Sequence, residues 1–195
     1  MNYYVRGVMI MRRLGQILSV ALIGILPAGM GIAQKAIETT SGTCVITVEG
    51  LWLDSFPVTA STDGVCGQAD VTLIVNNRDG EVLLSETQAP SSLFGFYEVN
   101  TPERMTMALE EWIGFNTSST TTGTLPDWIE GEAAPVASEF PFYVDDRVNH
   151  RTYISIRSQD MPMICFVQGM ESSRCLASDP EMLTLKLVGV QSFPG

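Results

Sequence analysis

The chain has 195 residues and carries 11 Lys and Arg against 22 Asp and Glu, a formal net charge of −11. It is long enough for one domain with a hydrophobic core. The acidic excess argues against nucleic acid and anionic lipid as partners, because both are bound through Lys and Arg. It favours basic proteins, cationic peptides or divalent metal ions, and it also helps an exported protein to stay soluble.

The first 33 residues have the three parts of a secretory signal. Arg12 and Arg13 form a short basic flank, the apolar run 14–26 follows, and Gly31-Ile32-Ala33 supplies the small residues of a cleavage site. The apolar run is shorter than the roughly 20 residues that a membrane-spanning helix needs. We expect cleavage after Ala33, export to the periplasm or the medium, and no stable membrane insertion afterwards. An uncleaved N-terminal anchor is the alternative.

The remaining part, residues 34–195, is expected to be a single extracytoplasmic β-rich domain. The signal contains three arginines and no acid, so the mature chain carries 8 basic and 22 acidic residues, a net charge of −14. All four cysteines lie in it, and an even number in an oxidising compartment predicts disulfides. We expect Cys44–Cys66 and Cys165–Cys175, because each pair is close in sequence and flanks a turn-rich segment. A zinc site is the alternative, but neither spacing is the short one of a zinc knuckle.

Short alternating segments follow one another along the mature chain. The segment 43–49 alternates and is expected to return through 51–56, and the clearest hairpin spans 71–85 around the turn 76–80. Further strands are expected at 93–99, 140–144, 152–157, 164–168, 174–177 and 183–190. The pattern predicts a mainly β domain, an antiparallel sandwich or barrel-like fold with at most one or two short helices.

One helix is predicted after residue 100. Thr101 suits its N-cap, Pro102 its first position and Glu103 its positive end. Apolar residues then recur at helical spacing, namely Met105, Leu109, Trp112 and Ile113. A strand through the same residues is the alternative. The Ser-, Thr- and Gly-rich stretch 116–124 that follows is expected to be a flexible surface loop.

His150 is the only histidine of the chain, which excludes multi-histidine zinc or copper sites within one molecule. It follows Asp145 and Asp146, and an Asp–His pair can activate a serine. A secreted hydrolase using His150 with Asp145 or Asp146 is therefore the alternative function. The sequence contains no G-x-S-x-G motif to supply the serine. We expect a turn between two strands at this point and assign no catalytic residue.

The acid-rich segment around Trp128 is the strongest candidate for a contact site. Glu130 and Glu132 follow the tryptophan closely, and an exposed tryptophan on a loop is typical of binding surfaces. Carboxylates beside tryptophans also occur in carbohydrate clefts, with Glu110 and Trp112 as further members here. Solvated loop charge is the simpler interpretation. We expect Trp128, Glu130 and Glu132 to bind a partner.

Two weaker patterns concern metal ions. Met161, Met163 and Met170 lie close in sequence, and thioethers can bind Cu(I) in exported proteins, but methionines in strands are usually core residues. The turn 76–81 faintly resembles a calcium loop but lacks the alternating ligands and the distant glutamate. No metal and no other cofactor is expected.

These features predict an exported, non-catalytic binding or inhibitor module whose acidic surface meets a basic envelope or secreted protein. A lysozyme-type enzyme is one example of such a partner, by analogy of size, charge and compartment alone. The alternatives are the hydrolase and a structural cell-envelope protein.

Overall fold

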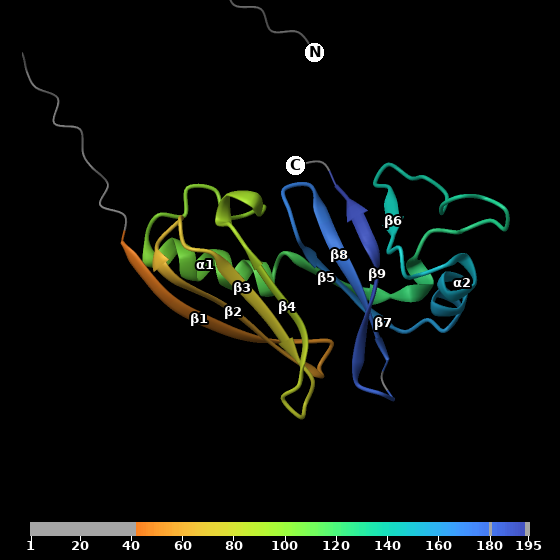
Figure 1. Ribbon diagram of the computed structural model, residues 1–195, viewed down its shortest axis with the longest axis horizontal. Helices are drawn as coiled ribbons and strands as arrows, with labels where there is room; N and C mark the ends of the chain where they lie inside the picture. Colours follow the sequence, from red (N-terminus) through yellow and green to blue (C-terminus); the bar gives the residue numbers. More distant parts are fainter. Residues whose placement is uncertain (1–41, 180, 194–195) are drawn as a thin grey trace, which may run out of the picture. The chain divides into compact units, whose positions relative to one another are not determined.

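The computed structural model of the protein describes residues 42–179 and 181–193. The expected signal, its cleavage after Ala33 and the first mature residues lie outside this part, so these predictions stay open. Two antiparallel sheets and two α-helices make up the described part (Figure 1), which confirms the mainly β prediction. No helix within residues 42–179 and 181–193 is long and apolar enough to cross a membrane.

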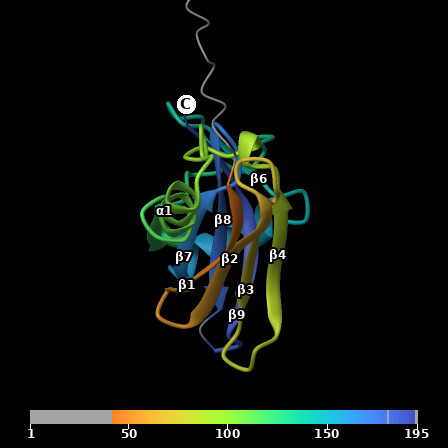
Figure 2. The same ribbon diagram turned by 90° about the vertical axis from the view of Figure 1, so that its left-hand side faces the viewer.

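The first sheet is a meander of four strands in the order β1-β2-β3-β4 (Figure 2). Its strands are β1 (Thr43–Trp52), β2 (Phe56–Val65), β3 (Val71–Asn76) and β4 (Val82–Gln88). The predicted hairpin 71–85 is confirmed, with Val71, Leu73 and Val75 all buried on one face. The predicted return through 51–56 is wrong, because β1 continues to Trp52 and the chain turns only at residues 53–55.

The turn between β3 and β4 is held by one asparagine side chain. The Oδ1 atom of Asn77 accepts hydrogen bonds from the backbone N–H groups of Asp79 (3.0 Å) and Glu81 (2.9 Å). The amide nitrogen of Asn77 donates to the Glu81 carboxylate at 2.7 Å. An Asx-type turn of this kind needs no metal ion.

The second sheet has five strands in the order β5-β7-β8-β9-β6. Its strands are β5 (Thr117–Thr121), β6 (Phe142–Val144), β7 (Pro162–Val167), β8 (Ser172–Asp179) and β9 (Thr184–Ser192). The expected loop 116–124 is therefore wrong in its first half, because Thr117–Thr121 pairs with β7 along its whole length. Threonine is β-branched and suits an extended backbone, so hydroxyl-rich composition alone did not identify a loop.

Two other predicted strands are also corrected. The segment 152–157 belongs to helix α2 (His150–Ser158). The Asn149 side chain caps this helix by accepting a hydrogen bond from the Thr152 N–H at 2.9 Å. Asn149 is a favoured N-cap residue, and this bond satisfies an otherwise free donor of the first turn. The segment 93–99 contains no strand; it follows a short 3-10 helix, Pro90–Ser92, and turns through positive φ angles at Gly95 (91°) and Glu98 (53°).

The predicted helix is confirmed as α1 (Pro102–Ile113). The Thr101 hydroxyl accepts from the Arg104 N–H at 3.3 Å, as its N-cap position predicts. The buried residues of α1 are Met105, Ala108, Leu109, Trp112 and Ile113. They lie on one face and pack into the first core, so the alternative strand is wrong.

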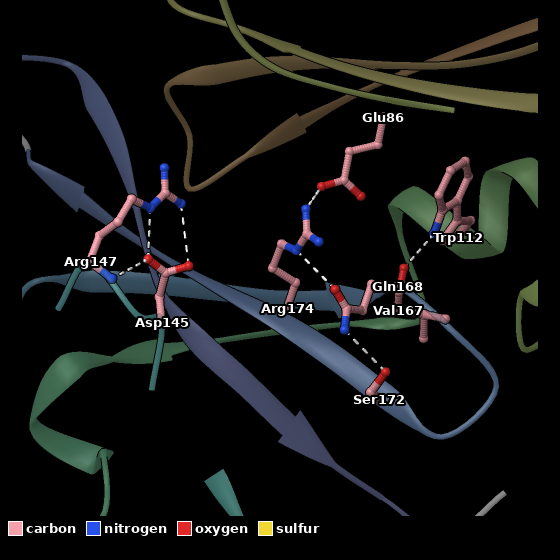
Figure 3. A network of polar contacts seen from close by, with 8 residues as sticks. All are labelled: Glu86, Trp112, Asp145, Arg147, Val167, Gln168, Ser172 and Arg174. Carbon is pink, nitrogen blue, oxygen red and sulfur yellow. Dashed lines mark hydrogen bonds and ion pairs between the residues drawn. The ribbon is translucent and has the colours of Figure 1, made fainter. Parts of the chain in front are cut away.

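Two tryptophans connect the first sheet, α1 and the second sheet. The indole N–H of Trp52, on β1, donates to the Ile113 carbonyl at 2.7 Å. The indole N–H of Trp112 donates to the Val167 carbonyl of β7 at 2.8 Å (Figure 3). Because both indoles are buried, each bond satisfies a donor that water cannot reach. The first core therefore lies between the two sheets and is closed by α1.

One ion pair also crosses between the sheets. Figure 3 shows Arg174 of β8 facing Glu86 of β4, and the two side chains form a salt bridge. The Arg174 Nε–H donates to the side-chain carbonyl of Gln168 at 2.9 Å, and the Gln168 amide donates to the Ser172 hydroxyl at 3.2 Å. Burial lowers the pKa of Arg174 from its ordinary value. An inward-pointing charge on an edge strand such as β4 also opposes pairing with foreign strands.

Both predicted disulfides are present. Cys44–Cys66 ties the start of β1 to the turn after β2, and Cys165–Cys175 joins two directly paired residues of β7 and β8. The zinc alternative is therefore wrong for these cysteines. Two disulfides indicate that the protein folds in an oxidising, extracellular environment.

Candidate functional site: a loop anchored by helix α2

His150 is the first residue of α2 and supports a loop. Its Nε2 atom lies 2.9 Å from the carbonyl oxygen of Trp128. A carbonyl oxygen only accepts hydrogen bonds, so Nε2 carries the proton and donates it. The prediction of a turn between two strands is wrong for His150 itself, because the residue begins a helix.

Two further side chains of α2 make the same kind of contact. The hydroxyl of Tyr153 donates to the Pro126 carbonyl at 2.8 Å, and the Nε–H of Arg157 donates to the Leu125 carbonyl at 2.7 Å. His150, Tyr153 and Arg157 are three and four residues apart, so they lie on one face of the helix. Together they bind three carbonyls of a segment that lacks regular secondary structure.

We call residues 125–136 the anchored loop. Beyond its carbonyl contacts, the Arg157 guanidinium forms an ion pair with Asp127 at 2.8 Å. The Val136 N–H donates to the Asp127 carbonyl at 2.7 Å and brings the ends of the loop together. These hydrogen bonds fix the base of the loop and pair its backbone polar groups. An irregular segment cannot pair these groups within itself.

Trp128 is half-buried within this loop. Its ring packs edge-on against His150 (centroids 5.2 Å apart) and Tyr153 (5.4 Å). Its indole N–H donates to the Glu132 carbonyl at 2.9 Å. The packing against α2 covers part of the ring, so Trp128 is only partly exposed. The contact role of Trp128 with a partner stays a prediction.

The tip of the anchored loop is exposed and combines apolar with acidic side chains. Ile129 is 61% exposed. Glu130 and Glu132, which follow it, are exposed as well. Gly131 has a φ of 91°, a conformation that favours glycine, and the Glu132 N–H donates back to the Ile129 carbonyl at 3.1 Å. The tip is therefore an ordered turn that presents an isoleucine beside two carboxylates.

The tyrosine hydroxyl under the loop is held in its protonated form. Burial raises the pKa of Tyr153 to about 12, with the Asp127 charge acting in the same direction and Arg157 opposing it. The protonated hydroxyl is the form that donates to the Pro126 carbonyl. The anchoring bond is consequently maintained throughout the neutral pH range.

The Asp145 carboxylate is paired with an arginine two residues further along the chain. The Arg147 side chain donates to both carboxylate oxygens, at 2.8 and 3.3 Å, and its backbone N–H donates at 3.1 Å (Figure 3). The side-chain hydrogen bond from Arg147 holds the pKa of Asp145 below its ordinary value. Within the described part, no hydrogen bond or ion pair joins His150 to Asp145 or Asp146. The hydrolase alternative thus has no assembled Asp–His pair to support it.

The other sequence candidates lie apart from the loop tip. Trp112 is fully buried, so it does not share a surface with Trp128, and Glu110 lies exposed on α1. Met163 is buried in the second core and Met161 packs against it. Among the described residues, no group of three or more His, Cys, Asp or Glu side chains could hold a metal ion.

Sequence reasoning does not identify Tyr153 and Arg157, because the local pattern of 152–157 predicts a strand. Asn149 as a helix N-cap, with His150, Tyr153 and Arg157 at spacings of three and four, was the signal that could have identified them. Comparison with known proteins returned no matching family model, no matching curated protein and no matching solved structure.

Proposed function

We propose that the mature domain is an exported, non-catalytic binding or inhibitor module, and that the tip of the anchored loop contacts a basic protein of the envelope or the medium. The observation that carries this proposal is the anchoring itself. Three side chains of α2 bind the carbonyls of residues 125, 126 and 128, while Ile129, Glu130 and Glu132 remain free at the tip.

Ordering of the loop before binding favours association. A flexible loop must lose conformational freedom when a partner binds, whereas a loop that is already held loses little. The mix of residues also suits an interface, since an apolar centre with a charged rim is the usual arrangement of a binding hot spot. Ile129 would supply the centre, and Glu130 and Glu132 the rim.

The charge distribution favours a basic partner. Three arginines of the described part, Arg147, Arg157 and Arg174, are already paired with acids of the same chain. The acids of the loop tip have no such partner among the described ion pairs. An acidic surface speeds the encounter with a basic protein. This attraction weakens as the salt concentration rises, because exposed charges are screened beyond about 8 Å at physiological ionic strength.

The test begins with a photo-crosslinking residue at position 129 of the exported protein, with the same residue at exposed Val82 of β4 as the control position. Crosslinked proteins are identified by mass spectrometry. We expect a basic protein to be captured from position 129 and not from position 82.

The captured protein is then titrated against two variants of equal charge. Glu130→Lys with Glu132→Lys should weaken binding about tenfold or more, and the loss should shrink at high salt. Glu110→Lys with Glu111→Lys, on the exposed side of α1, changes net charge by the same amount and should have a much smaller effect. Equal losses in both variants, or capture of an acidic protein, would contradict the proposal.

A further inference from the structure

A pocket lies where the β4–α1 connection meets the β2–β3 and β7–β8 turns. It is a cavity of about 490 Å³ and is lined mainly by apolar groups. Its wall includes the buried side chains of Leu93, Phe96 and Val99. We call it the end pocket. It shares no residue with the anchored loop, and it goes beyond the proposed function.

The backbone around the end pocket is constrained on several sides. Cys66 lines the pocket and is fixed by its disulfide to Cys44. The adjacent Gly67 has a φ of 76°, and a Cβ atom there would lie 2.5 Å from the Val99 carbonyl oxygen. Only glycine fits so close an approach. The segment that carries Leu93 and Phe96 is joined to the β7–β8 turn by a hydrogen bond from the Phe94 N–H to the Gly169 carbonyl at 3.2 Å.

The rim carries exposed groups that the fold does not use. Tyr97 lines the pocket and is 82% exposed, and Met170 lines it from the β7–β8 turn. Glu98 follows Tyr97 with a φ of 53°, a conformation that costs a non-glycine residue energy and that clusters at binding sites. The backbone there is held by Arg104, whose guanidinium donates to the Glu98 carbonyl at 3.2 Å.

The lining defines the chemistry of a ligand. The apolar wall and the volume suit a small organic molecule, since such sites commonly measure about 300–1,000 Å³. Among the described residues that line the pocket, Glu98 is the only charged one. A ring such as that of Tyr97 attracts a cation over its face. Both groups favour a positive charge at the mouth, and they act against the Arg104 guanidinium, which is bound to the Glu98 carbonyl.

We propose that the end pocket binds a small amphipathic cation, with its apolar chain against Met170 and the accessible edges of Leu93, Phe96 and Val99, and its ammonium group between Tyr97 and Glu98. The apolar part supplies burial, and the ammonium group supplies selectivity over neutral and anionic molecules of the same shape.

The test uses three probes with one hexyl chain, namely hexyltrimethylammonium, hexanol and hexyl sulfate, titrated into the isotope-labelled mature domain and followed by two-dimensional NMR. We expect hexyltrimethylammonium to shift the signals of residues 66–68 and 90–100 saturably, and to bind about tenfold or more tightly than the other two probes. Equal affinity for all three probes, or shifts spread over the whole acidic surface, would overturn the proposal.

Variants distinguish binding of the cation in this pocket from general attraction of a cation to an acidic protein. Tyr97→Ala and Glu98→Gln should each weaken binding of the cation severalfold. Tyr143→Ala removes another tyrosine that is 62% exposed, and Glu110→Gln removes an exposed carboxylate of α1; both should leave binding unchanged. Thermal unfolding confirms that each variant is folded. If Tyr143→Ala weakens binding as much as Tyr97→Ala does, the end pocket is not the site.

Discussion

The two faces of the second sheet are held in different ways. One face packs against the first sheet and α1, and its contacts are large buried side chains such as Trp52, Trp112 and Phe166. The other face lies under α2 and the anchored loop, where the core is smaller and side chains bond to backbone carbonyls. A regular element satisfies its own backbone and needs only apolar burial, whereas an irregular loop needs side chains to complete its hydrogen bonds.

The largest expected effect on the free energy of unfolding comes from replacing a tryptophan in each of the two regions. Trp112→Ala should lower the free energy of unfolding by about 4 kcal/mol, because it leaves a cavity in the first core. Trp128→Ala should lower it by about half as much, since the ring is only half-buried and the loop can relax. Denaturant titration of both variants measures the difference. Equal losses would show that the loop region is as tightly packed as the first core.

A smaller effect is expected from the ion pair between the sheets. Glu86→Gln leaves Arg174 charged and partly buried without its partner, and should cost about 2 kcal/mol of unfolding free energy. This is less than the roughly 3–5 kcal/mol of a fully buried pair, because Arg174 keeps 29% of its side chain exposed. Replacing both residues by leucine should recover most of the loss. A double variant as unstable as Glu86→Gln would contradict this account.

The smallest effect concerns the anchoring of the loop. Tyr153→Phe removes one hydrogen bond and should cost about 1 kcal/mol at neutral pH, with the fold otherwise intact. The native chain should also lose stability as pH rises from about 10 towards 12. The pKa of Tyr153 is raised from 10.0 to about 12 in the folded protein, so its contribution is complete below pH 10 and declines above it.

The measurement is the unfolding free energy of the native chain and of Tyr153→Phe from about pH 9 to pH 11.5. The two curves should converge as pH rises, because only the native chain has this hydroxyl to titrate. Tyr143→Phe serves as the control, since Tyr143 is exposed on β6. Parallel curves for the native chain and Tyr153→Phe would show that the hydroxyl is not held as described.

Much of the regular structure could be predicted from local patterns. The alternation of Val71, Leu73 and Val75 indicated a half-buried strand, and Thr101 with Pro102 indicated the start of α1. The disulfides followed from the even number of cysteines and their separations along the chain. Each of these signals acts over a few residues, or through a covalent constraint, and so is visible without the fold.

What only the tertiary structure decided is the environment of each candidate side chain. Sequence alone identified His150, Trp128 and the acids near them, but it offered a partner for the histidine, Asp145 or Asp146, only under the hydrolase alternative, and it did not show what covers the tryptophan. In the folded protein Asp145 binds Arg147, and His150 holds the Trp128 carbonyl. These partners are set by how α2 packs on the second sheet. That packing depends on contacts between residues far apart in the chain, which no local spacing records.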